Sequence, residues 1–246
     1  MISSDRMAAV DRNAAALGVP QKQLMESSGS AVARAVRRVA DPGAAVAVVA
    51  GRGNNGGDGL VATRFLDDYV TTVHLLGRPE TIRTRITREN WDALRAGEYD
   101  TRTLTDADAV DLGSPDVVVD AMLGTGVTGG LREPEATAAD AVNRADATVV
   151  SVDVPSGVNA DTGEVAGVAA DADSGRGAGV AVDADRVVTF HDRKPGLDAV
   201  DAEVTVADIG IPAAAERFVG PGDLLGLDRD PGSHKGDAGE VLVIGG

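Results

Sequence analysis

The sequence predicts an α/β protein with a doubly wound, mostly parallel sheet, which is a Rossmann-like three-layer sandwich. Short runs of valine and other β-branched residues recur along the chain, as expected for strands that are buried on both faces. Segments of helical composition alternate with these runs, and most runs end at a glycine or an aspartate. Such an alternation is typical of a parallel sheet covered by helices.

The first half of the chain shows this alternation. Residues 1–40 carry apolar residues at helical spacing, and Gly-Val-Pro at 18–20 interrupts the run. The apolar run at 46–50 and the glycines that follow it predict a strand and then a turn. In chain order we expect a strand at 46–50, a turn at 51–59, a helix at 60–68, a strand at 71–76, a helix at 80–96 and a strand at 99–104.

The second half continues the pattern. We expect a strand at 116–123, a helix at 133–145 whose start carries Pro134, and strands at 148–152, 187–190 and 204–207. Residues 167–173 are nearly repeated at 179–185. We interpret the stretch 167–185 as a loop insertion on the surface, since the entropy of loop closure rises slowly with length.

Composition excludes several kinds of protein. The formal net charge is −16, from 23 basic and 39 acidic residues, and only Lys22, Lys194 and Lys235 are lysines. An acidic, lysine-poor surface is typical of a halophilic protein from a salt-rich cytoplasm, and it argues against nonspecific binding of nucleic acid. No apolar run approaches the length of a membrane span, and no signal sequence opens the chain, so we expect a cytoplasmic protein. Without cysteine, neither disulfides nor thiolate zinc sites can form.

The segment 51–59, Gly-Arg-Gly-Asn-Asn-Gly-Gly-Asp-Gly, is the most unusual stretch. A strand that ends at such a turn before a helix is a ready anion site. The dinucleotide fingerprint G-x-G-x-x-G is matched, but the next strand ends in Gly77 and Arg78, without the acid that binds a ribose. The Walker pattern fails because Gly56 is not followed by lysine. An ordinary oxidoreductase is therefore disfavoured, while a plain polar turn stays open.

Polar residues mark the ends of three expected strands. They are Asn54, Asn55 and Asp58 after the first, Asp120 with the segment 124–130, and Asp153 with Ser156. The carboxyl ends of parallel strands share one edge, where ligands bind. Amide, hydroxyl and carboxylate oxygens favour a hard cation such as K⁺, Na⁺, Mg²⁺ or Ca²⁺, and so few carboxylates suit a monovalent ion. Singly, Asp120 or Asp153 could be a helix cap or a turn acid; together they indicate a site.

Five motifs carry a resemblance to a known family. They are the segment 51–59, Asp-Ala-Met-Leu-Gly-Thr-Gly at 120–126, Ser-Val-Asp-Val-Pro-Ser-Gly at 151–157 with Asn-Ala-Asp-Thr-Gly at 159–163, Lys-Pro-Gly-Leu at 194–197 and Asp-Ile-Gly-Ile-Pro at 208–212. With the opening helices, which include Asp11, these motifs resemble the NAD(P)H-hydrate epimerases, the YjeF N-terminal domain family. The resemblance covers roughly residues 5–218, with the motifs in matching order and spacing.

The resemblance implies a substrate, a cation and the residues that bind them. The substrate would be NADHX or NADPHX, the hydrated forms of NADH and NADPH, whose R and S forms the enzyme interconverts. One potassium ion per subunit would be held by Asn55, Asp120 and Ser156. The nucleotide would contact Asn54, Asn55, Gly56, Gly57, Asp58, Gly124, Thr125, Gly126, Val127, Thr128, Gly129, Gly130 and Asp153. Asp153 and Asp58 are the candidates for acid and base, and Asp153 is preferred because it ends a central strand and is not a cation ligand.

The chain is expected to divide into two unequal parts. Residues 1–220 would form the epimerase domain, and residues 221–246 a linker rich in Pro, Gly and Asp followed by the start of a second domain. The segment 234–246 is similar to the opening of an ADP-dependent, ribokinase-like NAD(P)H-hydrate dehydratase domain, which implies functional coupling to that activity. A homodimer is reasonable for the family. The alternative function is a non-catalytic nucleotide- or protein-binding module of the same fold.

Overall fold

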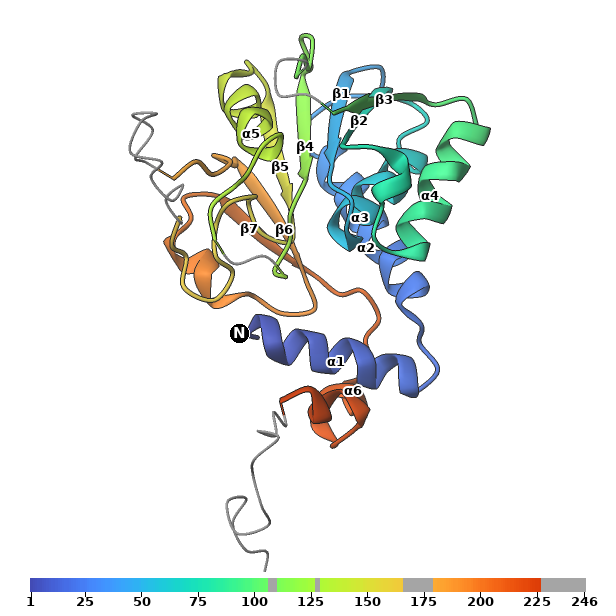
Figure 1. Ribbon diagram of the computed structural model, residues 1–246, viewed down its shortest axis with the longest axis vertical. Coiled ribbons are helices and arrows are strands. Elements are labelled where there is room, and N and C mark those ends of the chain that lie inside the picture. The colour runs from blue at the N-terminus through green and yellow to red at the C-terminus, as the bar shows by residue number, and fades with distance from the viewer. Residues whose placement is uncertain (106–109, 127–128, 166–178, 227–246) are drawn as a thin grey trace, which may run out of the picture.

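Seven parallel strands form one sheet at the centre of the described part of the chain (Figure 1). The structure is a computed structural model that describes residues 1–105, 110–126, 129–165 and 179–226. Along the sheet the strands run in the order β3-β2-β1-β4-β5-β6-β7, and every neighbouring pair is parallel. The strands are β1 (Ala45–Ala50), β2 (Val70–Leu76), β3 (Asp100–Leu104), β4 (Val117–Ala121), β5 (Thr148–Val152), β6 (Arg186–Phe190) and β7 (Glu203–Ala207).

Helices cover both faces of the sheet, so the predicted doubly wound α/β fold is confirmed. The α-helices are α1 (Ser4–Ala16), α2 (Gln21–Val36), α3 (Asn54–Arg64), α4 (Arg85–Ala96), α5 (Glu135–Arg144) and α6 (Ala213–Arg217). Short 3₁₀ helices occur at η1 (Pro79–Thr81), η3 (Pro195–Ala199) and η4 (Pro221–Gly226). The first strand, β1, lies inside the sheet, and β2 and β3 are added on one side of it. The chain then crosses to the other side of β1 to form β4, so the boundary between β1 and β4 is the switch point.

Alternate residues of each strand pack into two separate cores. Along β1, Val46 and Val48 contact the core under helices α1 to α4, whereas Ala47 and Val49 contact the core under α5. Side chains of successive strand residues point to opposite faces, so a strand covered on both sides is apolar at most positions. This is why the buried strands could be located as valine-rich runs, with Asp120 of β4 and Ser151 of β5 as buried polar exceptions.

Three helices differ from the sequence expectation. The helix expected at 60–68 begins at Asn54 and ends at Arg64, so the prediction of a nine-residue turn was wrong and the turn is only residues 51–53. The helix expected at 80–96 is divided into η1 and α4, because Thr84 caps α4 by accepting a hydrogen bond from the backbone of Thr87. The helix expected at 133–145 is shorter, with Pro134 as its N-cap.

The segment expected to begin a linker is instead packed against the domain. Pro221–Gly226 forms η4, which lies on α1 (Figure 1). The buried side chain of Asn13 accepts a hydrogen bond from the backbone of Gly222 and donates one to Asp223, which also pairs with Arg6. The packed part of the chain therefore extends to Gly226. The expected second-domain start at 234–246 and residues 167–178 of the expected insertion lie outside the described residues. The remaining residues of that stretch, 179–185, were expected on the surface, but Val182 and Ala184 are buried in the core under α5, so this part of the prediction was wrong.

Every helix in the described ranges is too short or too polar to cross a lipid bilayer.

Candidate active site

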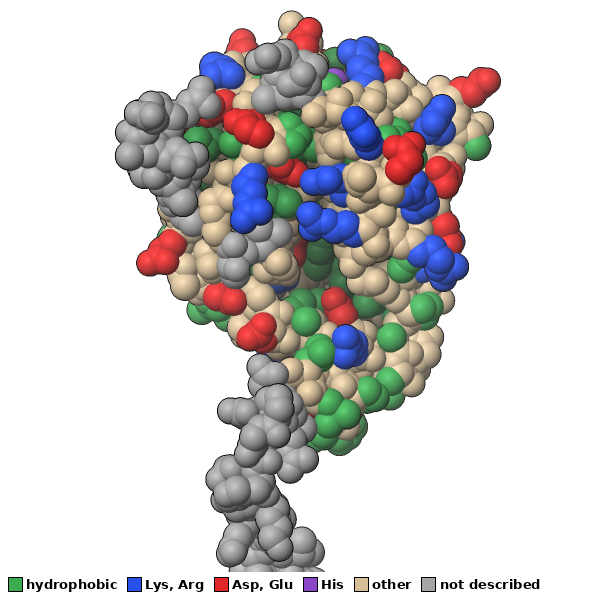
Figure 2. All heavy atoms as spheres, in the orientation of Figure 1, with side chains coloured by type: hydrophobic (Ala, Val, Ile, Leu, Met, Phe, Trp, Pro, Cys, Tyr) green, Lys and Arg blue, Asp and Glu red, His purple; other side chains and the backbone are tan. Residues whose placement is uncertain are grey.

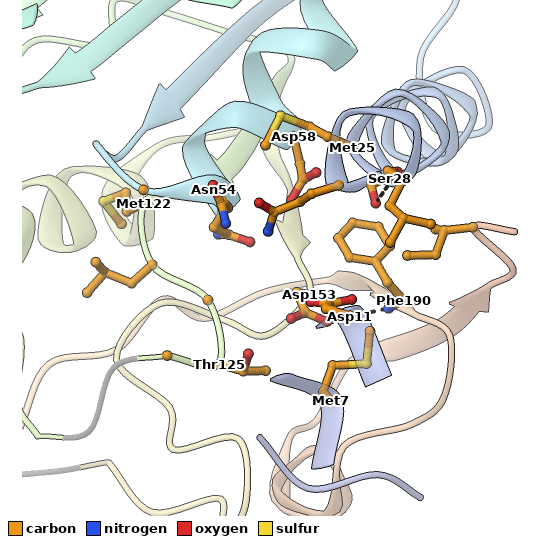
Figure 3. A pocket seen from close by; sticks show the side chains of 18 of the residues that line it. Met7, Asp11, Met25, Ser28, Asn54, Asp58, Met122, Thr125, Asp153 and Phe190 are labelled. Carbon is orange, nitrogen blue, oxygen red and sulfur yellow. Dashed lines mark hydrogen bonds between the residues drawn. The ribbon is translucent and has the colours of Figure 1, made fainter. Parts of the chain in front are cut away.

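A pocket of about 340 Å³ opens at the carboxyl ends of β1, β4, β5 and β6 (Figure 3). Its wall is made by α1, α2, the start of α3, the loop after β4, and the residues that follow β5 and β6. The polar and charged side chains that line it are Asp11, Gln21, Ser28, Arg52, Asn54, Asn55, Asp58, Arg83, Thr125, Glu135, Asp153 and Lys194. This is the sheet edge at which the sequence predicted a site.

The glycines of the segment 51–59 allow close packing rather than a flexible turn. A Cβ atom on Gly51 would overlap the carbonyl oxygen of Met122, and one on Gly56 would overlap the carbonyl oxygen of Gly51. Both obstacles are backbone atoms, which cannot move aside like the end of a side chain. A Cβ on Gly59 would lie 2.6 Å from the Cβ of Ala121. These glycines therefore bring the N-terminus of α3 against the ends of β1 and β4.

Two asparagines stand at that helix N-terminus. Asn54 and Asn55 form the first turn of α3, and no side chain caps this helix at Gly53. Among the described residues, neither Oδ1 of Asn54 nor Nδ2 of Asn55 has a hydrogen-bond partner, although both atoms are buried. Polar atoms that are buried without a partner cost free energy, so they indicate that a ligand completes the site. The free amides and positive end of a helix dipole favour an anionic ligand group.

Asp120 and Ser156 are joined beneath the loop after β4. The Ser156 hydroxyl donates to Oδ1 of Asp120 at 2.6 Å, and the Ser156 backbone amide donates to Oδ2 at 2.9 Å. The Ser151 hydroxyl donates to the same Oδ2 at 2.8 Å. The Ser156 hydroxyl also accepts a hydrogen bond from the backbone of Leu123 at 3.0 Å. Burial raises the pKa of Asp120, and the hydrogen bonds from Ser156 and Ser151 only partly offset this effect.

The residues expected to hold a monovalent cation lie around the same loop. The backbone amide of Leu123 donates a hydrogen bond to the Ser156 hydroxyl. The next residue, Gly124, lies beside Asn55, and a Cβ added to Gly124 would be 3.1 Å from Oδ1 of Asn55. The set supplies one buried carboxylate, one hydroxyl and one amide oxygen, which fits a monovalent ion. No cluster of three or more His, Cys, Asp or Glu side chains in the described residues could hold a metal ion, so a carboxylate-rich divalent site is not part of this arrangement.

Asp153 ends β5 in a backbone conformation that is unusual for a residue with a side chain. Its φ angle is 67°, in the left-handed region. Its Oδ1 accepts a hydrogen bond from the Thr189 hydroxyl at 3.0 Å and lies 2.8 Å from the ammonium of Lys194. Lys194 is fully buried and also donates to the carbonyl of Phe190 at 2.7 Å. The carboxylate of Asp153 is thus fixed in orientation and partnered by a buried cation.

Three carboxyl groups converge on the pocket from α1, α3 and β5 (Figure 3). Burial raises the pKa of Asp58 well above its usual range, and the carboxylates of Asp153 and Asp11 raise it further. Burial, followed by the charge of Asp153, raises the pKa of Asp11 to about 6. This arrangement places Asp58, a carboxyl whose pKa is raised, close to Asp11 and Asp153, which is the kind of environment found around acid and base catalysts.

The predicted nucleotide contacts are only partly on the pocket wall. Asn54, Asn55, Asp58, Gly124, Thr125, Gly126 and Asp153 line it. Gly56 is buried against Gly51, and Gly57 against Met25 and Thr87, so both lie behind the wall. Gly129 lines a smaller adjoining cavity, and Gly130 lines neither cavity. Val127 and Thr128 lie outside the described residues.

Seven of the polar and charged side chains that line the pocket were not among the site residues predicted from sequence. They are Asp11, Gln21, Ser28, Arg52, Arg83, Glu135 and Lys194. The two arginines line the pocket, and Figure 2 shows basic side chains beside the hollow in this face. The rarity of lysine was a signal for Lys194 in the sequence, because only three of the 23 basic residues are lysines.

A doubly wound sheet with a polar pocket at its switch point defines the class of Rossmann-like proteins that bind a ligand at the carboxyl edge of the strands. Residues 21–196 match the family model described as YjeF-related protein N-terminus. The chain belongs to this family.

Curated relatives extend the comparison. The chain is 47% identical over 252 residues to the bifunctional NAD(P)H-hydrate repair enzyme Nnr of Methanothermobacter thermautotrophicus, covering 98% of this chain and 46% of that protein. It therefore spans about half the length of such relatives. It is 38% identical to the NAD(P)H-hydrate epimerase of Cenarchaeum symbiosum, covering 89% of this chain and 99% of that protein. The crystal structure of the yeast protein ynu0 shares the fold, with a TM-score of 0.68, 24% identity and 96% coverage of both chains.

Proposed function

We propose that this chain is an NAD(P)H-hydrate epimerase, an isomerase that interconverts the R and S forms of NADHX and NADPHX in the repair of nicotinamide nucleotides. The observation that carries the proposal is the meeting of Asp58 and Asp153, in contrasting environments, in one pocket at the switch point. Relatives of similar length, from Cenarchaeum symbiosum and Nitrosopumilus maritimus, are named NAD(P)H-hydrate epimerase, which supports it.

The reaction requires a proton donor and a proton acceptor. In the hydrate, the reacting carbon bears a hydroxyl group and the ring nitrogen. When the hydroxyl accepts a proton, the C–O bond breaks, water leaves, and the nitrogen lone pair forms a C=N⁺ bond. Water then adds to the other face of this carbon and loses a proton. Opening and reclosing of the ring would also epimerise the carbon: the hydroxyl loses its proton as the carbonyl forms, the C–N bond breaks and the nitrogen gains a proton, and closure on the other face reverses these transfers.

The two carboxyl groups suit these two tasks. Asp58 is buried and its pKa is raised well above the usual range by burial, so it is the better suited of the two to donate a proton to the leaving hydroxyl. Asp153 is ion-paired with Lys194, so its carboxylate can accept the proton of the incoming water. The buried pocket holds both groups next to one reacting carbon and limits the access of other water.

Binding of the nucleotide would use the helix N-terminus and the pocket mouth. The uncapped start of α3 offers backbone amides, Asn55 offers a buried Nδ2 donor and Asn54 a buried Oδ1 acceptor, both without a partner among the described residues. Gly124, Thr125 and Gly126 form the opposite wall. Arg52 and Arg83 add positive charge to the lining, which suits phosphate groups on an otherwise acidic protein.

A potassium ion would be held by Asn55, Asp120 and Ser156, whose oxygens surround the loop after β4. When bound, the ion supplies positive charge beside the buried carboxylate of Asp120 and ties the loop to α3. This assignment belongs to the proposal.

The surroundings of the enzyme are also part of the proposal. The relatives named bifunctional repair enzymes carry about half their length beyond this match, so we propose that the epimerase works together with a dehydratase domain. Residues 1–220 remain the proposed epimerase domain, with the segment 221–226 packed on it. A cytoplasmic location, a salt-rich environment and a homodimer complete the proposal, and the net charge of −16 supports the salt-rich environment.

The test is direct measurement of interconversion. Purified R and S hydrates of NADH and NADPH are incubated separately with the full chain in KCl, and the two forms are separated by chromatography over time. We expect each form to convert to the same equilibrium mixture at a rate proportional to enzyme concentration. Saturable binding of both hydrates with no acceleration of interconversion would overturn the proposal and favour a non-catalytic binding module.

A further inference from the structure

The hydrogen bonds to the Asp153 side chain all end on one of its two oxygens. Lys194 Nζ lies 2.8 Å from Oδ1, the Thr189 hydroxyl donates to it at 3.0 Å, and the Phe190 backbone amide donates at 3.4 Å. Within the described residues, no hydrogen bond reaches Oδ2. Because Asp153 lines the pocket, the second oxygen is the one available to a bound substrate.

The Lys194 side chain is also fixed by its surroundings. It is 0% exposed, and besides its ion pair with Asp153 its ammonium donates a hydrogen bond to the carbonyl of Phe190 at 2.7 Å. The chain has lysine at only three positions among 23 basic residues, so a buried lysine here departs from its strong use of arginine. A compact ammonium can bridge these two oxygen atoms, whereas the planar fork of arginine needs a different geometry.

Several titratable side chains surround Asp153. Asp11 faces it from α1, Asp58 from α3, and Lys194 and His191 follow β6. Three carboxyl groups in one buried pocket cannot all be ionised without a large cost. A lysine ammonium in contact with only one of them favours the negative charge on that one.

We propose that Lys194 is a positioning residue of the epimerisation: it fixes the Asp153 carboxylate through Oδ1 and leaves Oδ2 free to exchange a proton with the substrate. This inference rests on the proposed function. Although Lys194 borders the pocket, its side chain is 0% exposed, so the effect is assigned to its contact with Asp153 and not to contact with the substrate.

The experiment compares Lys194→Met with Lys194→Arg and with a control pair elsewhere in the sheet. Arg186 and Glu203 form an ion pair at 2.7 Å between β6 and β7, outside the pocket lining, so Arg186→Met is the control. For Lys194→Met we expect kcat to fall about 100-fold, because the base is no longer held in its productive geometry. We expect KM to change by less than about threefold, since the lost interaction is not with the substrate.

A conservative replacement separates positioning from a merely structural role. Lys194→Arg should recover only part of the lost kcat, because it restores the charge but not the geometry. Arg186→Met should leave kcat unchanged.

A double variant tests whether Lys194 acts through Asp153 and also guards against misfolding. Lys194→Met leaves a buried carboxylate without its partner and could unfold, whereas Lys194→Met with Asp153→Asn removes both charges. We expect the double variant to melt cooperatively and to match the rate of Asp153→Asn alone within about twofold. Additive losses of rate would overturn the inference, as would a wild-type kcat in folded Lys194→Met. If the wild-type chain itself fails to interconvert the hydrates, the proposed function is what fails.

Discussion

Ser156 donates one hydrogen bond to each oxygen of Asp120, from its hydroxyl at 2.6 Å and from its backbone amide at 2.9 Å. The Asp120 carboxylate is fully buried, and the charge of its ionised form is compensated by hydrogen bonds alone in the described residues. A carboxylate in this condition gains most from a nearby cation. This relationship leads to the first prediction.

Potassium should stabilise the fold through Ser156. At constant ionic strength, replacement of choline by K⁺ should raise the free energy of unfolding of the wild-type chain by about 1–3 kcal/mol at saturating concentration. Ser156→Ala should lose most of this K⁺-dependent increment, measured by thermal or urea unfolding of each protein with and without K⁺. Equal stabilisation of wild type and variant would remove Ser156 from the cation site.

Asp153 should be needed for chemistry more than for binding. Asp153→Asn keeps the size of the side chain but cannot accept a proton, so interconversion should slow by about 100-fold or more. Binding of the hydrate, measured by titration calorimetry, should weaken far less. Asp198→Asn, an exposed carboxylate of η3 paired with Arg193, serves as the control. A wild-type rate for Asp153→Asn would exclude the proposed base.

Asp11 should make the stability of the protein depend on pH. Burial raises its pKa in the folded state to about 6 from 3.8, so the folded state binds this proton more tightly than the unfolded chain does. Its contribution is fully present below about pH 4 and is lost as the pH rises through 6. Asp11→Asn avoids that loss, so its free energy of unfolding relative to wild type should rise by about 1–2 kcal/mol between pH 4.5 and pH 7.5.

The control for this measurement is Asp92→Asn, at an exposed position of α4. Its difference from wild type should stay flat over the same pH range. A flat difference for Asp11→Asn as well would contradict the burial and charge coupling described for the pocket.

Replacement by alanine should lower the stability of the fold strongly at Gly56 and hardly at all at Gly53. A Cβ on Gly56 would overlap the carbonyl oxygen of Gly51, whereas a Cβ on Gly53 meets no atom within 4 Å. Gly56→Ala should therefore lower the free energy of unfolding by about 3 kcal/mol or more, because two backbone segments would have to separate. Gly53→Ala should remain within about 0.5 kcal/mol of wild type in urea unfolding. Similar stability of the two variants would contradict the close packing of α3.

The net charge of −16 should make folding depend on salt. Self-repulsion of an acidic surface is screened at high ionic strength, so the melting temperature should rise between low salt and molar KCl. A parallel series in molar NaCl separates general screening from the K⁺ effect. Circular dichroism melting curves that do not change with either salt would refute this expectation.

The strand pattern could be read from sequence because each buried strand leaves a local signature. Val46 and Ala47 face different cores, yet both must be apolar, and this produces the continuous runs that marked the sheet. That Asn55, Asp120 and Asp153 lie at one edge of the sheet, at or just after the carboxyl ends of β1, β4 and β5, follows from parallel topology alone.

Other features depended on contacts between distant segments. The start of α3 at Asn54 was missed because glycine disfavours helix, and here packing of Gly56 on Gly51 outweighs that propensity. Asp11 and Lys194 reach the pocket from α1 and from the residues after β6, and no local pattern states where such side chains point. Their roles required the three-dimensional arrangement.

Helix α1 contributes Asp11 to the pocket on one side and rests on η4 through Asn13 and Asp223 on the other. A shortened protein that stopped at residue 220, where composition alone would place a boundary, would lose this brace. Asn13 would then lose its hydrogen bonds to Gly222 and Asp223, and α1, which carries Asp11, would no longer be fixed relative to the pocket. Weak activity of such a truncated protein would result from the loss of η4 and not from a defect of the catalytic residues. Expression of the isolated domain should therefore retain residues 221–226.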